Sequence, residues 1–375
     1  SRETEINLLH RNLKMNIETQ EVVEDIYEEG EETIENVVPP TDIFAFNESR
    51  SCADLKRMYD KKQIDISPDF QREQVWNSPS KARFLDSLLK NLPIPSMCIS
   101  LDMSSQKRVV IDGLQRISTI VEFLDAVEND KDLVLSSLDD IDDRLSGKSI
   151  KQIKKYSPDV ISFIENVSIP VTVLRCDLSK ENHMEYIFTI FHRLNTGGTK
   201  LNNQEIRNCI FNGNFNDILF ECSYQKNKEL ESLLGKKNSR FTFEEFILRF
   251  FAFQDKLNNY NGKLTSFLNE YMRENRKLSE DKITDKRDLF TKTVDVFYSK
   301  ITKEEKFSRV ILEALLYGVG RNLEKSSSMS KEDFNFLCQE ILNSTAFQSS
   351  ELQGGLMQQN KVKARLNIAD EIFRR

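Results

Sequence analysis

The segment RVVIDGLQRISTI, Arg108 to Ile120, decides how the first half of this sequence folds. The apolar run Val109 to Ile111 predicts a β-strand that ends at Asp112-Gly113. A helix with one apolar face follows directly, because apolar residues recur at helical spacing at Ile117, Ile120, Val121, Leu124 and Val127. The turn between the two elements is therefore predicted to be rigid, and polar side chains surround it.

Two interpretations of this turn are open from the segment alone. In the first, the unpaired N–H groups and the dipole of the helix start form an anion site. Gly113 would let a phosphate approach the backbone, Arg116 would reach into solvent as a two-pronged cation, and Ser118 and Thr119 would add hydroxyl groups. In the second, Asp112 is simply the N-cap of a strand–helix corner.

A second polar cluster lies in FHRLNTGGTKLNNQEIRN, residues 191–208. A helix ends before Asn195, since its apolar stripe consists of Met184, Ile187, Phe188, Phe191 and Leu194. A new helix begins after Asn202, which has capping-box spacing to Glu205.

The end of one helix and the start of the next do not require the other residues of this cluster. Gly197 and Gly198 stand where one glycine would serve, and at least one is expected at positive φ. Arg193 and Arg207 flank the turn, and a glycine loop between two arginines is suited to a polyanion.

Two further side chains have alternative roles. His192 lies on the polar side of its helix, where it is either an ordinary surface residue or a general base. Arg249 is either a packing residue paired with Glu245 or a cation that reaches a nucleotide cleft.

Composition limits the class of protein. The 375 residues are 30% charged with a mean hydropathy of −0.50, enough for two or three domains. We find no signal peptide and no apolar run near the ~18 residues of a membrane span. Six scattered cysteines without a C-x-x-C pair predict reduced core thiols in a cytoplasmic protein, and three histidines make a zinc site improbable.

Charge and periodicity divide the chain into three parts. Residues 1–40 hold three Lys or Arg and eleven Asp or Glu, a net charge of −8, and this acidic leader is expected to be mobile. Because the whole chain has a net charge of −7, the remaining residues carry a net charge of +1. Residues 41–212 form an α+β domain, and residues 213–375 form an all-α helical domain. The last residues of the chain contain more Lys and Arg than Asp and Glu.

Several elements of the first domain are predicted. Residues 54–61 form a helix, residues 63–76 are extended, and a further helix has Ser78 as N-cap, with Pro79 next and an apolar stripe that extends to Leu92. Strands are expected at residues 96–101, 108–112 and 168–176, and a charged, helical insertion at 130–166. In the second domain, helices are expected within residues 241–253, 263–272, 288–301, 307–323 and 333–347.

Three motifs in this order carry a resemblance to a known family. They are PDFQREQVWNSPSKARFLDSLLKNLPIP, residues 68–95, VIDGLQRISTI, residues 110–120, and residues 191–208. Together they resemble the N-terminal domain of GmrSD-type modification-dependent restriction endonucleases, which is similar to the ParB/sulfiredoxin fold with its small mixed sheet. The family's middle motif is D-G-Q-Q-R, tied to binding and hydrolysis of nucleoside triphosphate and to sensing DNA in phage defence.

The resemblance implies site residues and a ligand. Asp112, Gly113, Gln115 and Arg116 match the middle motif, whereas Leu114 stands where the family has Gln, and the turn lacks the reactive cysteine of sulfiredoxin. The implied catalytic residues are Asp112, Gln115, Arg116 and Arg193; the implied nucleotide-binding residues are Gln71, Arg72, Gly113, Ser118, Thr119, Asn195, Gly197, Gly198, Arg207 and Asn208. The ligand would be a nucleoside triphosphate with Mg²⁺, without a metal site built from protein side chains alone.

Two function classes follow from the resemblance. One is an NTP-hydrolysing component of a DNA-modification-sensing, anti-phage system; the other is a ParB-like DNA- or partner-binding module in which nucleotide is only a switch or is not used. Full-length family members carry an HNH nuclease domain that needs histidines, but none lies in the last 183 residues here. Pro68-Asp69 has no matching nuclease motif after it. We therefore expect a protein partner to cut DNA, or weak nicking by this domain, with weak or modification-dependent DNA binding and no membrane association.

Overall fold

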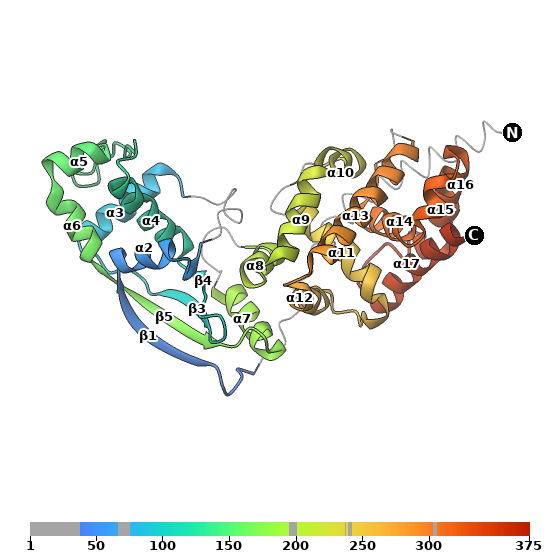
Figure 1. Ribbon diagram of the computed structural model, residues 1–375, viewed down its shortest axis with the longest axis horizontal. Coiled ribbons are helices and arrows are strands. Elements are labelled where there is room, and N and C mark those ends of the chain that lie inside the picture. Colours follow the sequence, from blue (N-terminus) through green and yellow to red (C-terminus); the bar gives the residue numbers. More distant parts are fainter. Residues whose placement is uncertain (1–37, 67–75, 195–200, 237, 239–241, 303–305) are drawn as a thin grey trace. The chain divides into compact units, whose positions relative to one another are not determined.

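The computed structural model describes residues 38–66, 76–194, 201–236, 238, 242–302 and 306–375 (Figure 1). Contacts within the chain separate a unit that ends at Ile210, here the N-terminal unit, from the C-terminal unit, Phe211–Arg375. The N-terminal unit combines a mixed sheet with helices, and the C-terminal unit is mainly helical, which confirms the predicted α+β class.

The sheet of the N-terminal unit has five strands in the order β1-β5-β3-β4-β2. β5 runs parallel to β3, and β4 runs parallel to β2, whereas the other neighbours are antiparallel. The strands are β1 Phe44–Ser51, β2 Ile64–Asp65, β3 Met97–Asp102, β4 Arg108–Asp112 and β5 Ser168–Cys176. The predicted strands 108–112 and 168–176 are thus confirmed, and the predicted strand 96–101 is shifted by one residue.

Helices cover both faces of this sheet. They are α2 Cys52–Asp60, α3 Ser78–Leu89, α4 Leu114–Glu128, α5 Ile150–Tyr156, α6 Pro158–Asn166, α7 Glu181–Leu194 and α8 Asn203–Ile210. Val110 and Val173 belong to one apolar core with residues of α2, α3, α4 and α6. Ile111 and Leu174 alternate with them and are buried on the opposite face, where α7 and α8 contact β4.

Some sequence expectations about these elements are wrong. The N-cap of α3 is Asn77, whose side chain accepts a hydrogen bond from the Ser80 N–H at 2.9 Å, so Ser78 is the first helical residue. The same helix ends at Leu89, because Asn91 adopts a left-handed conformation with φ 51°, and Leu92 is half exposed outside it. The insertion 130–166 is helical only in α5 and α6.

β1 was not predicted from the sequence. Its residues pair along their whole length with β5, from Phe44 opposite Arg175 to Ser51 opposite Ser168. The predicted extended segment 63–76 contains β2, and its residues 67–75 lie outside the described residues.

The C-terminal unit is built around two buried helices. Its elements are α9 Asn214–Gln225, α10 Asn227–Leu234, α11 Thr242–Lys256, η2 Leu257–Asn259, α12 Leu264–Asn275, α13 Glu280–Lys300, α14 Arg309–Arg321, α15 Leu323–Ser328, α16 Lys331–Leu342, η3 Thr345–Phe347 and α17 Gln359–Arg374. α11 and α14 are buried on nearly all sides and contact each other. Each of the predicted helical segments overlaps one of these helices, and α14 lies entirely within its segment.

Arg249 of α11 has the structural role. It is fully buried and lies 3.0 Å from Glu245, which confirms the predicted pair, and 3.7 Å from Glu313 of α14. The alternative, that Arg249 reaches a nucleotide cleft, is wrong, because the guanidinium lies inside the helical core.

The cysteines are core thiols. All six are buried and none forms a disulfide, which confirms that prediction. Burial raises the pKa of Cys52, Cys98, Cys176 and Cys222 to about 12, so these thiols are not nucleophiles at neutral pH. Within the described ranges, no helix is both long and apolar enough to span a membrane.

Candidate functional site

The turn between β4 and α4 requires a glycine. Gly113 has φ +97°, in the left-handed region, and is itself the N-cap of α4. A Cβ at this position would lie 2.6 Å from Met97 Cγ and 3.1 Å from an Arg116 guanidinium nitrogen. The interpretation of Asp112 as the N-cap is wrong, because the chain turns one residue later and no side chain caps the helix.

Asp112 and Arg116 form an ion pair across this turn. One Asp112 carboxylate oxygen accepts a hydrogen bond from Arg116 at 2.9 Å, and the Arg116 guanidinium also donates to the carbonyl oxygen of Pro95. The Arg116 side chain is only 13% exposed, against 46% for Asp112, and burial lowers the Arg116 pKa against the effect of Asp112. The expectation of a solvent-reaching Arg116 is therefore wrong: the side chain also braces the loop before β3.

Gln115 ties the turn to the start of α3. Its Oε1 accepts a hydrogen bond from the Trp76 N–H at 2.9 Å. Leu114, the departure from the family motif, is partly buried and packs against the apolar core of the unit. The side chain that replaces the family's Gln therefore points toward the interior.

The two predicted hydroxyl groups differ in position. Thr119 is buried, and its Oγ1 donates to the Gln115 carbonyl oxygen at 2.8 Å; it also lines a small pocket of about 40 Å³ between α3 and α4. Thr119 therefore faces the helix layer, and the expectation that its hydroxyl group contacts a phosphate at the turn is wrong. Ser118 is half-buried one residue earlier.

The motif at residues 191–208 lies beside the strand that leads into the turn. Both α7 and α8 contact β4, which carries Asp112 at its end. Arg193 is exposed in the last turn of α7. Arg207, predicted to bind a polyanion beside the glycine turn, is fully buried in α8. The reason is tertiary: every residue of α8 from Gln204 to Ile210 is buried.

Polar side chains fill the buried part of α8. Gln204 Nε2 donates to Asn208 Oδ1 at 3.0 Å, and Arg207 donates to Gln204 Oε1 at 3.4 Å. Asn208 Nδ2 is buried and has no hydrogen-bond partner in the described part of the chain. The capping box at the start of α8 is confirmed, since Asn202 and Glu205 exchange hydrogen bonds of 2.6 and 2.8 Å.

Both described histidines are held by neighbours. His192 Nε2 lies 2.6 Å from Asn203 Oδ1, and its ring contacts Phe188, so it joins α7 to α8. His183, which the sequence analysis did not single out, accepts from the Asp177 N–H at Nδ1 and lies 2.8 Å from Asp42 Oδ1 at Nε2. Its ring is buried, and no sequence pattern signals this role.

The remaining predicted residues lie outside the described residues. They are Gln71, Arg72, Asn195, Gly197 and Gly198. Trp76 and Leu194, the nearest described positions, belong to the same unit as the turn.

Mg²⁺ bound with a nucleotide fits the donor set at the turn. Within the ranges that the structure covers, no three His, Cys, Asp or Glu side chains gather as metal ligands. Mg²⁺ commonly uses one or two carboxylates together with the phosphates of its nucleotide. The half-exposed Asp112 is a carboxylate suited to that role, and the nucleotide would supply the other ligands.

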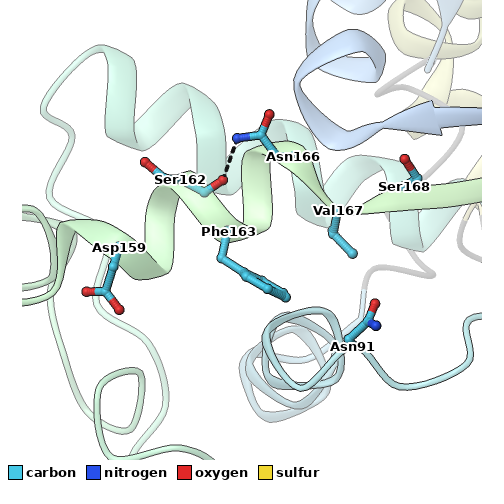
Figure 2. A pocket seen from close by; sticks show the side chains of 7 residues that line it. All are labelled: Asn91, Asp159, Ser162, Phe163, Asn166, Val167 and Ser168. Carbon is cyan, nitrogen blue, oxygen red and sulfur yellow. Dashed lines mark hydrogen bonds between the residues drawn. The ribbon is translucent and has the colours of Figure 1, made fainter.

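A separate surface pocket of about 600 Å³ contains none of the predicted catalytic or nucleotide-binding residues (Figure 2). It lies between α6 and the end of α3 and is lined by Asn91, Asp159, Ser162, Phe163, Asn166, Val167 and Ser168. The Asn166 amide is used within α6, where it donates to the Ser162 carbonyl oxygen at 2.7 Å. The β4–α4 turn, where Gln115 and Arg116 bind residues of the motif at 68–95, is therefore the better candidate site.

Comparisons with known proteins bear on the same residues. A family model described as GmrSD restriction endonuclease, N-terminal domain, matches residues 55–212, a span that includes the turn, α7 and α8. Searches of curated proteins and of solved structures found no match. The similarity to the ParB/sulfiredoxin fold therefore stays a prediction.

Proposed function

We propose, from the premise that residues 55–212 belong to the GmrSD restriction endonuclease N-terminal domain family, that this chain is the nucleotide-binding component of an anti-phage restriction system. In this proposal, a nucleoside triphosphate binds with its phosphates at the β4–α4 turn. The protein then uses nucleotide binding, and hydrolysis, in sensing DNA.

The observation that carries the proposal is the uncapped start of α4. Gly113 turns the chain into a 15-residue helix without any side-chain cap, so the dipole and the first-turn N–H groups face the turn. The close approach of Met97 fixes the geometry of this backbone, and a rigid donor array binds an anion without a cost for ordering it.

Neighbouring side chains supply charge and selectivity. Arg116 adds a cation that is already oriented by Asp112 and Pro95, and Asp112 would share Mg²⁺ with the phosphates. Asn208 adds a buried amide donor without a described partner on α8, a helix that contacts β4. Arg193, exposed at the end of α7, is the remaining candidate for stabilising charge on the transferred phosphoryl group.

A second candidate function is a binding module in which nucleotide acts only as a switch or is not used. Two observations favour it: Leu114 packs into the core where the family has Gln, and Gln115 already binds the Trp76 backbone. Both reduce the polar groups that could orient a water molecule for hydrolysis. In either case we propose that a protein partner supplies nuclease activity and that DNA is bound weakly.

Thermal unfolding with each of the four NTPs, with and without Mg²⁺, tests the proposal. A ligand at ~100 times its Kd stabilises the folded protein by about 2.7 kcal/mol. We expect this shift for at least one NTP and its loss in Arg116→Lys, which keeps the charge but not the fork that spans Asp112 and Pro95. Arg144→Lys is the matched control, because Arg144 pairs with Asp142 and Asp159 at a surface of the same unit.

Phosphate release then separates the two functions. Steady release by wild type that is lost in Asp112→Asn supports the hydrolase, and a thermal shift without release supports the switch. No shift with any NTP would contradict the nucleotide site in both versions.

A further inference from the structure

Two aromatic rings are exposed at the free edge of the sheet. Phe44 is 61% and Phe46 42% exposed, and both belong to β1, the edge strand beside β5 (Figure 1). They are two residues apart in a strand, so they project from the same face at a spacing of roughly 7 Å. Natural proteins protect such an edge with charged side chains or Pro; β1 has no Pro, and its charged residues, Glu48 and Arg50, lie beyond the two rings in the strand.

The strand register places arginines in line with these rings. Phe44 lies opposite Arg175 of β5, Arg175 opposite Leu101 of β3, and Leu101 opposite Arg108 of β4. Directly opposite residues share one face of a sheet, so a single row across four strands carries a ring and two guanidinium groups. The next row begins with Phe46 and continues inward to the buried Val173.

The cations of this row lack carboxylate partners. Neither Arg175 nor Arg108 forms a salt bridge with any residue that the structure describes, and the buried Arg108 Nε has no hydrogen-bond partner there. Elsewhere in this unit, cations such as Arg50 and Arg144 are paired with carboxylates. The two arginines of this row are therefore unpaired positive charges in line with an exposed ring.

We propose that this surface, the sheet-margin surface formed by Phe44, Phe46, Arg108 and Arg175, binds single-stranded DNA. Aromatic rings stack on unpaired bases, and the cations neutralise the phosphates that connect them. A duplex keeps its bases stacked inside, so the rings could not reach them. A second copy of this chain would bring the same positive charges into one interface, whereas a DNA strand complements them.

The choice of DNA over RNA rests on the proposed function, which concerns DNA. The surface itself is separate from the β4–α4 turn, since Phe44 and Arg108 lie at the opposite end of the strands from Asp112. Binding at the two places can therefore be tested independently.

The test is fluorescence anisotropy of a labelled 12-nucleotide DNA strand with the full-length protein over a salt series. We expect a log–log salt slope of about −1.4, because two cations each contribute about −0.7 for a single strand. Phe44→Ala/Phe46→Ala should weaken binding at least tenfold, and Arg175→Gln should reduce the slope by about 0.7. An abasic strand of equal charge should bind wild type and the double variant equally weakly.

The control is Tyr156→Ala, which removes a 72% exposed ring beside Lys155 on α5 of the same unit and should leave binding unchanged. The NTP thermal shift should be the same in the double variant, which separates failure of this proposal from failure of the nucleotide site. Unchanged binding by the double variant, abasic strands that bind as tightly as normal ones, or tighter binding of RNA would each overturn the proposal. So would a wild-type dimer that the double variant converts to a monomer, since the surface would then join two copies of the chain.

Discussion

Gln115 holds the backbone of Trp76: the Gln115 Oε1 accepts a hydrogen bond from the Trp76 N–H at 2.9 Å. The Trp76 ring in turn packs edge-on against Phe84 of α3, with 5.5 Å between ring centroids. One motif residue at the start of α4 thus anchors a residue of another motif, residues 68–95. Gln115 therefore has a structural role at the turn in addition to its proposed role in nucleotide binding and hydrolysis.

Gln115→Ala should release Trp76. Loss of this hydrogen bond should lower the free energy of unfolding by about 1 kcal/mol, and the indole should become more accessible to a quencher. Trp76 is the only tryptophan, so acrylamide quenching of protein fluorescence reports on it alone. Asn129→Ala at the other end of α4 removes a similar amide and should leave quenching unchanged; equal quenching of wild type and Gln115→Ala would show that the bond does not hold Trp76.

Gly113→Ala should destabilise the protein more than Gly147→Ala. Both glycines have positive φ, which costs an alanine about 1–2 kcal/mol, but only at Gly113 would the new Cβ overlap Met97. At Gly147 the nearest atom, in Ser137, is 3.4 Å away. We expect an extra loss of about 1–3 kcal/mol for Gly113→Ala in urea unfolding, and a smaller loss from the same substitution when it is made in a Met97→Ala variant. Equal losses for the two glycines would show that the Met97 contact yields without cost.

Arg193 and Arg207 should respond oppositely to substitution. Arg207→Met removes a fully buried polar side chain from a hydrogen-bonded group and should cost on the order of 3 kcal/mol of stability. Arg193→Met, at an exposed position, should leave the melting temperature within about 1 °C and weaken only NTP binding or turnover. Calorimetric melting with an NTP titration checks both, and a stable Arg207→Met that loses only ligand would restore the sequence-based expectation of a binding arginine.

Asp42 should make stability fall at acid pH. Its hydrogen bond to Lys180, and then that to His183, lower the pKa of this carboxyl from 3.8 to about 2. A carboxyl group whose pKa is lowered in the folded state stabilises the protein at pH values above its pKa in the unfolded state. This stabilisation is lost as the pH falls through its pKa in the folded state. The stability difference between wild type and Asp42→Asn should therefore be constant above about pH 5 and vanish between about pH 4 and 2. A difference that persists at pH 2 would contradict the assignment.

Removal of residues 1–40 should tighten duplex DNA binding. The leader carries −8, and the rest of the chain +1. The basic C-terminal residues contribute little, because Lys361, Arg374 and Arg375 are paired with Glu351, Asp370 and Glu340. We expect weak binding by the intact chain at physiological salt and a steeper salt slope after truncation, measured by filter binding. Equal affinities with flat slopes would leave no role for duplex DNA.

The sequence predicted elements whose signal is local. β5 has the predicted bounds because its apolar residues occur in one short run between polar flanks, and the capping box at Asn202 depends only on residues three apart. β1 was missed because its two phenylalanines face solvent at a sheet edge, so no buried stripe marks it.

The errors in the site have a common origin in tertiary contacts. The burial of Arg207 follows from the packing of α8, and the bracing of Arg116 follows from Pro95, 21 residues earlier. Neither contact leaves a periodic pattern in the sequence. The conformation of Gly113, by contrast, was open to prediction, because a strand, a glycine and a helix in succession restrict the backbone between them.

The pairing of β1 with β5 also sets the order of events during synthesis. Among the strands that the structure describes, β5 alone pairs with β1, yet residues 52–167 separate them in the chain. At 5–20 residues per second, a ribosome needs on the order of ten seconds to add that stretch. The first strand to emerge is thus the one whose partner emerges last, and the nascent sheet closes only when the chain has passed Cys176. Until then Phe44 and Phe46 are an unpaired apolar segment that chaperones can bind, which makes the earliest part of this domain its most vulnerable during translation.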